Sequence, residues 1–200
     1  SGVYGMVVPH AVGLTSINIS LWLVSLGIGK TWPVDFIWSS WPIMQGAFLA
    51  TYAGAARAPR NALVMGAVSI WGLRLTANFV RRGGIGHEDW RYTEMREQQG
   101  RFFWIGSLFT VFLVQSSFMF SGCLPLYPAL LSDAVPVAYA HGGAAVMAIA
   151  TVIEATADKQ MDVFLAEEKQ SASATRAVMD RGLWAWSRHP NYFGEWFFWV

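Results

Sequence analysis

The side chains best suited to chemistry gather near the end of the chain, in the stretch DRGLWAWSRHPNYFGEWFFWV at residues 180–200. Positions 188–195 include Arg188, His189, Asn191, Tyr192 and Glu195. Because proline lacks a backbone N–H and fits the first helical turn, we expect a helix to begin at Pro190. The unpaired N–H groups and the dipole of such a helix start, beside two cationic side chains, favour an anion such as a phosphate. Asn191 and Glu195, four residues apart, would share one face of this helix.

A second polar group lies upstream, at the end of an apolar stretch. Glu154 and Asp158 are four residues apart in the sequence EATADKQ, so on a helix both carboxylates face one way. Carboxylates at this depth are costly unless they are paired or hydrogen-bonded. Two interpretations stay open. The pair accepts hydrogen bonds from a cofactor, or it joins two helices through an ion pair with Arg74 or Arg188.

A third polar group is the sequence RRGGIGHEDWRY at residues 81–92. Its glycines suit a tight loop, but they are too few and wrongly placed for a dinucleotide-binding fingerprint. The loop either neutralises its own charges at the surface or closes over a bound cofactor. His87, Glu88 and Asp89 lack a second His or Cys at ligand spacing, so we expect no metal site here.

The composition indicates which elements must position these groups. Of the 200 residues, 54% are hydrophobic and only 14% are charged, and the mean hydropathy is +0.35. A soluble domain is about one quarter charged. The charges are also bunched, because residues 1–29, 36–56, 61–73, 102–132 and 134–153 contain no Asp, Glu, Lys or Arg. Since about 20 apolar residues cross a bilayer core, the sequence predicts an integral membrane protein.

The expected fold is all-α, a polytopic transmembrane helix bundle that forms a single domain over residues 1–200. We expect six spans, at about 7–28, 36–55, 61–80, 102–122 and 137–157 and from Pro190 onward. The last span ends in mid-apolar run at Val200, so we expect the chain to continue beyond it. Residues 166–179 are expected to be a polar connection.

The basic residues predict the orientation of these spans. With alternating spans, Lys30 and the basic residues of segments 81–101 and 158–189 share one side, whereas Arg57 and Arg60 lie opposite and Arg74 lies within the membrane. The positive-inside rule places the richer side in the cytoplasm, at the endoplasmic reticulum of a eukaryote or the inner membrane of a bacterium. No basic tract suggests a nucleic-acid partner, and Cys123 is the single cysteine.

The string GLWAWSRHPNYFGE at residues 182–195 resembles the signature of the steroid 5-alpha-reductase-like membrane reductases, in particular their broad, uncharacterised branch. Segments around Asp35, Trp71–Leu75, Glu88–Tyr92 and Glu154–Gln160 are similar to that branch too. The resemblance implies a helix bundle in which NADPH binds from the cytoplasm and reduces an activated carbon–carbon double bond in a lipid-like substrate, a steroid or another enone. Residues implied for cofactor binding are Glu154, Asp158, Asn191 and Glu195, accompanied by Arg188, His189, Tyr192 and Arg74.

Reduction of an enone also requires a donor aimed at the carbonyl oxygen and an acid for the other carbon. Tyr52, Gln45 and Tyr92 are the candidate catalytic residues. The steroid reductases hold the substrate carbonyl with a Glu on the second helix and a Tyr on the third, but residues 36–55 contain no acidic residue and Trp71 falls near the Tyr position. The resemblance therefore does not identify a steroid as substrate.

Two other functions remain open. Membrane methyltransferases of the isoprenylcysteine or phospholipid type also carry an Arg-His-Pro-x-Tyr stretch before a helix and use S-adenosylmethionine. That cofactor has no phosphate, so it has less use for an anion-binding helix start. A non-enzymatic lipid-binding protein or a transporter is the third possibility. Transporters generally show repeat symmetry, and none is evident in the sequence.

Overall fold

The computed structural model describes residues 4–52, 58–134, 136–170 and 178–200, which contain helices and turns but no strand. Contacts divide the chain into two compact units, Ser1–Val137 and Ala138–Val200. Within the described residues, four helical segments are long and apolar enough to cross a membrane: Gly5–Ile28, Pro59–Arg81, Trp90–Gly122 and Val137–Gln170. The all-helical prediction is therefore confirmed for the described residues, and the four apolar helices suggest a membrane protein, whereas the six expected spans are not all found.

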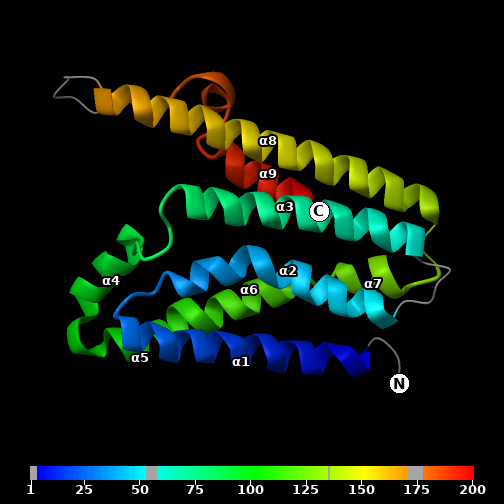
Figure 1. Cartoon of the computed structure of the whole chain (residues 1–200), viewed down its shortest axis with the longest axis horizontal. Coiled ribbons are helices and arrows are strands. Elements are labelled where there is room, and N and C mark those ends of the chain that lie inside the picture. Colours follow the sequence, from blue (N-terminus) through cyan, green and yellow to red (C-terminus); the bar gives the residue numbers. More distant parts are fainter. Residues whose placement is uncertain (1–3, 53–57, 135, 171–177) are drawn as a thin grey trace. The chain divides into compact units, whose positions relative to one another are not determined.

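The first unit is a bundle of helices that run side by side (Figure 1). Its long helices are α1 (Tyr4–Ile28), α2 (Pro33–Tyr52) and α3 (Ala58–Arg81). Helix α2 packs against α1, α3 and α7 (Leu126–Leu131). The α2–α3 approach is close because Gly72 has no side chain: a Cβ there would lie 2.6 Å from the backbone oxygen of Ser39. Small residues permit such close helix packing in membranes.

Helix α2 is not among the membrane-spanning candidates, which differs from the prediction for 36–55. It ends at Tyr52, and residues 53–55 lie outside the described part of the chain. Its sequence includes polar residues such as Asp35, Ser39 and Gln45, and these lower its hydropathy. Several of them are buried against other helices, so α2 is an interior helix of its unit.

The segment after the 82–89 loop is helical earlier than expected. Helix α4 (Trp90–Gln99) begins after Asp89, whose side chain accepts a hydrogen bond from the backbone N–H of Arg91 and caps the helix. A 3₁₀ turn η2 (Gly100–Phe102), helix α5 (Phe103–Ser107), a π-helical stretch η3 (Leu108–Leu113) and helix α6 (Val114–Gly122) follow. The prediction that 81–101 is a loop is therefore wrong for residues 90–101.

Arg60 was expected with Arg57 on the side opposite the richer basic segments, and that side stays a prediction. It lies in the first turns of α3 and is only 6% exposed. Its guanidinium Nη2 donates to the carbonyl oxygen of Leu130, 3.4 Å away. Arg57, its expected companion, lies outside the described residues.

The second unit consists of helix α8 (Val137–Gln170), a segment at 178–189 that contains the 3₁₀ turn η4 (Gly182–Ala185), and helix α9 (Pro190–Trp199). With 34 residues, α8 is about 51 Å long at 1.5 Å per residue. It continues well past the expected end at Ala157 and includes residues 166–170, which were expected to be a connection. Helix α9 begins at Pro190 as predicted, and its 10 residues extend to Trp199.

Candidate functional site

The segment 178–189, called the strap below, is held against α8 in a fixed register. The indole Nε1 of Trp184 donates to the carbonyl oxygen of Ala157 at 3.0 Å. The backbone N–H of Leu183 donates to Oε1 of Gln160, also at 3.0 Å. Gly182 has φ +60, a backbone conformation that favours glycine, and a Cβ there would lie 2.5 Å from Nε2 of Gln160 and displace that amide.

The strap delivers the chain to the start of α9, where the predicted anion-binding residues lie. Pro190 is the first helical residue, and the backbone N–H of Phe193 donates to the carbonyl oxygen of His189 at 3.0 Å. The imidazole of His189 stacks on the ring of Tyr192, with centroids 5.3 Å apart. Arg188, His189 and Tyr192 are exposed. Arg188 and the stacked rings of His189 and Tyr192 therefore flank an exposed helix start.

Helix α9 packs closely against α8 at Gly194. A Cβ on this residue would lie 2.6 Å from Cγ of Glu154 and 3.0 Å from the carbonyl oxygen of Ala150. Asn191 is three residues earlier and lies on the same side of α9. The structure thus brings the start of α9 to the turn of α8 that carries Glu154, as the sequence predicted for this pair of segments.

The polar groups at this crossing are largely buried. Glu154 is 2% exposed and Asp158 is 8% exposed, and Glu195 is partly buried. The side-chain oxygen Oδ1 of Asn191 is buried and accepts no hydrogen bond from the described residues. A buried amide oxygen without a donor is costly, so this atom is suited to accept a hydrogen bond from a bound molecule.

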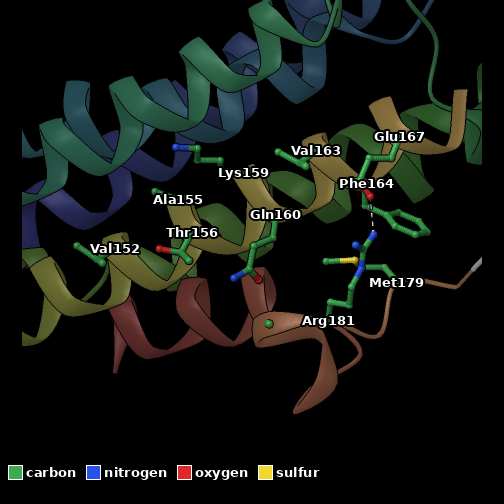
Figure 2. A pocket seen from close by; sticks show the side chains of 11 residues that line it. Val152, Ala155, Thr156, Lys159, Gln160, Val163, Phe164, Glu167, Met179 and Arg181 are labelled. Atoms are coloured by element: carbon green, nitrogen blue, oxygen red, sulfur yellow. Dashed lines mark hydrogen bonds and ion pairs between the residues drawn. The ribbon is translucent and has the colours of Figure 1, made fainter. Parts of the chain in front are cut away.

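The second unit also contains an open groove of about 700 Å³, at a different place. It follows another face of α8, along Val152, Thr156, Lys159 and Val163, and one wall is the strap near Arg181 (Figure 2). None of the predicted cofactor-binding residues lines it. The hollow and the polar crossing are therefore separate features of the unit.

The three candidate catalytic residues all lie in the first unit, and they do not converge. Gln45 is 2% exposed, and its Oε1 accepts from Nε1 of Trp41 at 2.7 Å. Tyr52 ends α2, is 55% exposed and has its ring 5.1 Å from that of Phe48. Tyr92, on α4, bonds to Asp35, which precedes Gln45 on α2 by about 15 Å of helix.

Tyr92 belongs to a polar network that the sequence did not reveal. Its hydroxyl donates to Oδ1 of Asp35 at 3.1 Å and accepts from Nε2 of Gln115 at 2.9 Å. Asp35 lies just before the apolar stretch that starts at Phe36. Burial raises the pKa of Asp35 to about 6, and nearby Asp89 adds to this effect, whereas the Tyr92 hydrogen bond and the charge of Arg91 oppose it.

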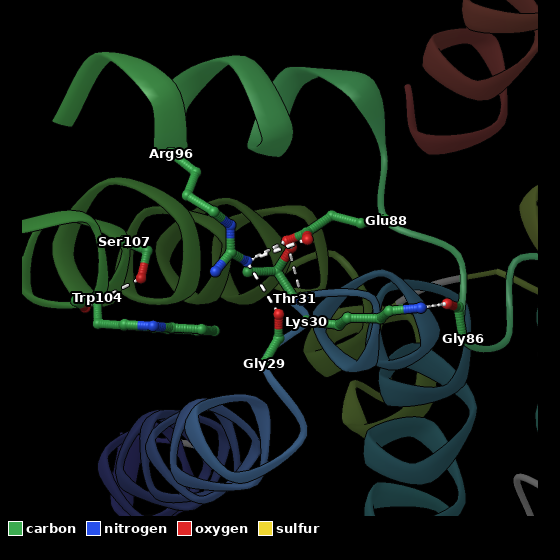
Figure 3. Close-up of polar contacts among 8 residues, drawn as sticks. All are labelled: Gly29, Lys30, Thr31, Gly86, Glu88, Arg96, Trp104 and Ser107. Carbon is green, nitrogen blue, oxygen red and sulfur yellow. Dashed lines mark hydrogen bonds and ion pairs between the residues drawn. The ribbon is translucent and has the colours of Figure 1, made fainter. Parts of the chain in front are cut away.

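The 82–89 loop is tied down by its own charges and by the α1–α2 connection (Figure 3). Nη2 of Arg96 donates to both carboxylate oxygens of Glu88, at 2.8 and 3.0 Å, and to the carbonyl oxygen of Gly29 at 3.1 Å. Oε1 of Glu88 also accepts from the hydroxyl and the N–H of Thr31. The ammonium of Lys30 donates to the carbonyl oxygen of Gly86. We call these contacts the latch; they favour the self-neutralising interpretation of the loop.

Two further buried groups were not predicted to interact. Nδ1 of His10, on α1, lies 2.6 Å from the hydroxyl of Tyr127 on α7. Sequence spacing gives no signal for this contact, because 117 residues separate the two.

Arg74 is partly buried on α3 of the first unit, and its role beside Glu154 stays a prediction. Among the described residues, no group of three or more His, Cys, Asp or Glu could hold a metal ion.

Comparison with known proteins identifies the family to which the chain belongs. Residues 21–200 match the model of a family described as "Protein of unknown function (DUF1295)". The chain is 29% identical over 221 residues to an uncharacterized protein of Schizosaccharomyces pombe, with 96% of the chain and 63% of that relative covered. The chain thus spans less than two thirds of the length of this curated relative. No solved structure matches the present chain.

Proposed function

We propose that this chain, which belongs to the DUF1295 family of proteins of unknown function, is an NADPH-dependent membrane reductase. The reaction is reduction of an activated carbon–carbon double bond in a lipid-like enone. The observation that carries the proposal is the crossing of α8 and α9 at Gly194, which brings the Arg-His-Pro-Asn-Tyr motif to the turn of Glu154. The likeness of this motif to the steroid 5-alpha-reductase-like signature supports it.

The residues at the crossing fit a dinucleotide. Arg188 and His189 at the exposed start of α9 supply positive charge for phosphates. Asn191 offers a buried oxygen for a carboxamide or hydroxyl donor. Glu154 and Asp158 offer carboxylates that can accept from ribose hydroxyls. Donors and acceptors thus occur on the two helices in the combination that a nicotinamide nucleotide requires.

In this proposal the bound cofactor supplies the hydride, and the chain positions the substrate and a proton. Of the three candidate donors, Tyr92 has the most defined setting, since its hydroxyl is held between Asp35 and Gln115. A tyrosine hydroxyl held in this way can donate to a carbonyl oxygen, and the carboxyl of Asp35 can return the proton. Gln45 and Tyr52 remain alternative carbonyl donors.

The proposed orientation follows the basic residues. The apolar part of α2, from Phe36 to Tyr52, provides a further crossing, because its length of about 17 residues is at the lower end of the range for transmembrane helices. The basic residues of segments 81–101 and 158–189 then face the cytoplasm, as the positive-inside rule predicts. A sixth crossing would require apolar sequence beyond α9. Cytosolic NADPH would reach the start of α9 directly.

A binding titration tests the proposal and separates it from the methyltransferase alternative. The purified protein is titrated with NADPH and, separately, with S-adenosylmethionine. We expect saturable binding of NADPH that is weakened about five- to tenfold in Asn191→Ala, the effect of losing one hydrogen bond. The control Gln98→Ala removes an exposed amide on α4 and should leave binding unchanged. Saturable binding of S-adenosylmethionine without NADPH binding would exclude the reductase.

A further inference from the structure

The groove on α8 lies on a face of the helix that the proposed cofactor site does not use. Its floor follows Val152, Thr156 and Val163, spaced by four and seven residues along one side of α8. At about 100° per residue, Thr156 lies about 200° around the helix from Glu154, which places them on nearly opposite sides. A molecule in this groove would therefore be distinct from one bound at the α8–α9 crossing.

The lining of the groove is mostly apolar. Val152, Ala155, Val163, Phe164 and Met179 contribute hydrocarbon surface. Val152 is 63% exposed and Val163 is 50% exposed, so within the chain these side chains are only half covered. Exposed apolar surface on a membrane helix is suited to an acyl chain, which is itself apolar. The groove thus favours a long hydrocarbon ligand over a polar metabolite.

The groove also has charged residues at its rims. The ammonium of Lys159 is exposed and makes no ion pair or hydrogen bond with the described residues, and it lies at one rim (Figure 2). Arg181 lies at the other rim, where it binds Oε2 of Glu167 at 2.7 Å. One cation is thus already paired, and Lys159 is available for an anion.

The position of the groove along α8 identifies where that anion would come from. Residues 134–153 contain no charged side chain, and Lys159 is the first basic residue after them. The groove extends from Val152 in the apolar part of α8 to Glu167 in the polar part. It therefore crosses the level at which lipid headgroups lie, where basic side chains attract anionic lipids.

We propose that this groove binds one anionic phospholipid. Its phosphate pairs with Lys159, and one acyl chain follows the apolar floor along Val152 and Val163. The same lipid touches Met179 and Gly182 of the strap, so it contacts α8 and the strap at once. Bound lipid therefore stabilises the strap against α8. This inference does not depend on the proposed reductase activity.

Two pairs of matched variants test the proposal in the full chain. Lys159→Gln and Lys169→Gln remove the same charge from exposed positions of α8, but only Lys159 lines the groove. Ala155→Trp fills the groove, whereas Ala166→Trp places the same side chain at an exposed position outside it. Each protein is purified in detergent and titrated with phosphatidylglycerol or phosphatidylcholine. Retained lipid is measured by native mass spectrometry, and strap protection by limited proteolysis.

We expect the unsubstituted protein, Lys169→Gln and Ala166→Trp to retain one phosphatidylglycerol in preference to phosphatidylcholine and to show a protected strap. Lys159→Gln should bind phosphatidylglycerol about fivefold more weakly, the effect of one lysine near an anionic lipid surface, and Ala155→Trp should lose the lipid. Equal retention of both lipids, or equal effects of the two lysine substitutions, would overturn the proposal. So would a loss of NADPH affinity in Lys159→Gln with phosphatidylglycerol binding intact, because the groove would then be a nucleotide site.

Discussion

Gly194→Ala is the substitution that most directly probes the α8–α9 crossing. The added Cβ would lie 2.6 Å from Cγ of Glu154, 3.0 Å from the carbonyl oxygen of Ala150 and 3.2 Å from the backbone nitrogen of Glu154. The Glu154 side chain can turn away, but the two backbone atoms belong to a continuous helix and cannot. Helix α9 must therefore move by a few tenths of an ångström to restore ordinary contact distances, and overpacking of this kind costs about 1–3 kcal/mol.

The gain in helix propensity partly offsets this cost. Alanine is favoured over glycine inside a helix by about 1 kcal/mol, so the expected net loss is up to about 2 kcal/mol. Gly143→Ala is the matched control, because it makes the same change within α8 where nothing lies within 4 Å of the added atom. It should stabilise the protein by about 0.5–1 kcal/mol.

Thermal unfolding in detergent measures both variants. For a chain of this size, 1 kcal/mol corresponds to about 2–4 °C, so Gly194→Ala should unfold several degrees below Gly143→Ala. NADPH affinity should fall in Gly194→Ala and stay unchanged in Gly143→Ala. If Gly194→Ala proves as stable as its control, α9 does not pack on α8 at Glu154, and the proposed cofactor site loses its geometric basis.

Two further predictions concern the first unit. Because the pKa of Asp35 is raised from 3.8 to about 6, the folded protein keeps a proton that the unfolded chain releases, so stability should fall by up to about 3 kcal/mol as the pH rises from about 4 to 6. Unfolding of Asp35→Asn across this range should lack that decline, and a decline of equal size would contradict the assignment. Arg96→Ala, which leaves Glu88 without its charged partner, should cost about 1–3 kcal/mol and expose the 82–89 loop to proteases. In the control Arg91→Ala, the lost ion pair between Arg91 and Asp89 is exposed, so the loss of stability should be less than about 1 kcal/mol. An equal loss of stability in both variants would argue against the latch.

Local signals predicted the parts of the structure that depend on neighbouring residues. Proline at a helix start located α9, and charge-free segments located α1, α3 and the apolar part of α8. Asp89 followed by a polar helix-forming sequence is a capping signal, so α4 could have been predicted as well. Hydropathy locates apolar segments but gives no information on where a helix ends in water. The polar end of α8, at residues 166–170, was therefore mistaken for a connection.

The features that depend on distant residues could not be predicted. Thr31 and Glu88 are 57 positions apart, and no periodicity connects them. Gly194 could be recognised as small, but the helix it packs against follows only from the structure. The interior position of α2 has the same origin, since its Asp35 bonds to Tyr92 on α4 and its Ser39 to Thr76 on α3. In the sequence alone, the polar residues of α2 only lower the hydropathy of the segment.

The length of α8 makes its polar end sensitive to the surrounding bilayer. A helix of 34 residues measures about 51 Å, and a hydrocarbon core takes up about 30 Å of it. Roughly 20 Å of continuous helix then extends beyond the hydrocarbon core into water, so a change of tilt within the membrane moves this end of the helix. Tilting it by 10°, well within the range by which helices adjust to thicker or thinner membranes, would swing its free tip by about 3–4 Å. A change in membrane thickness would thus shift the C-terminal end of α8 near Gln170.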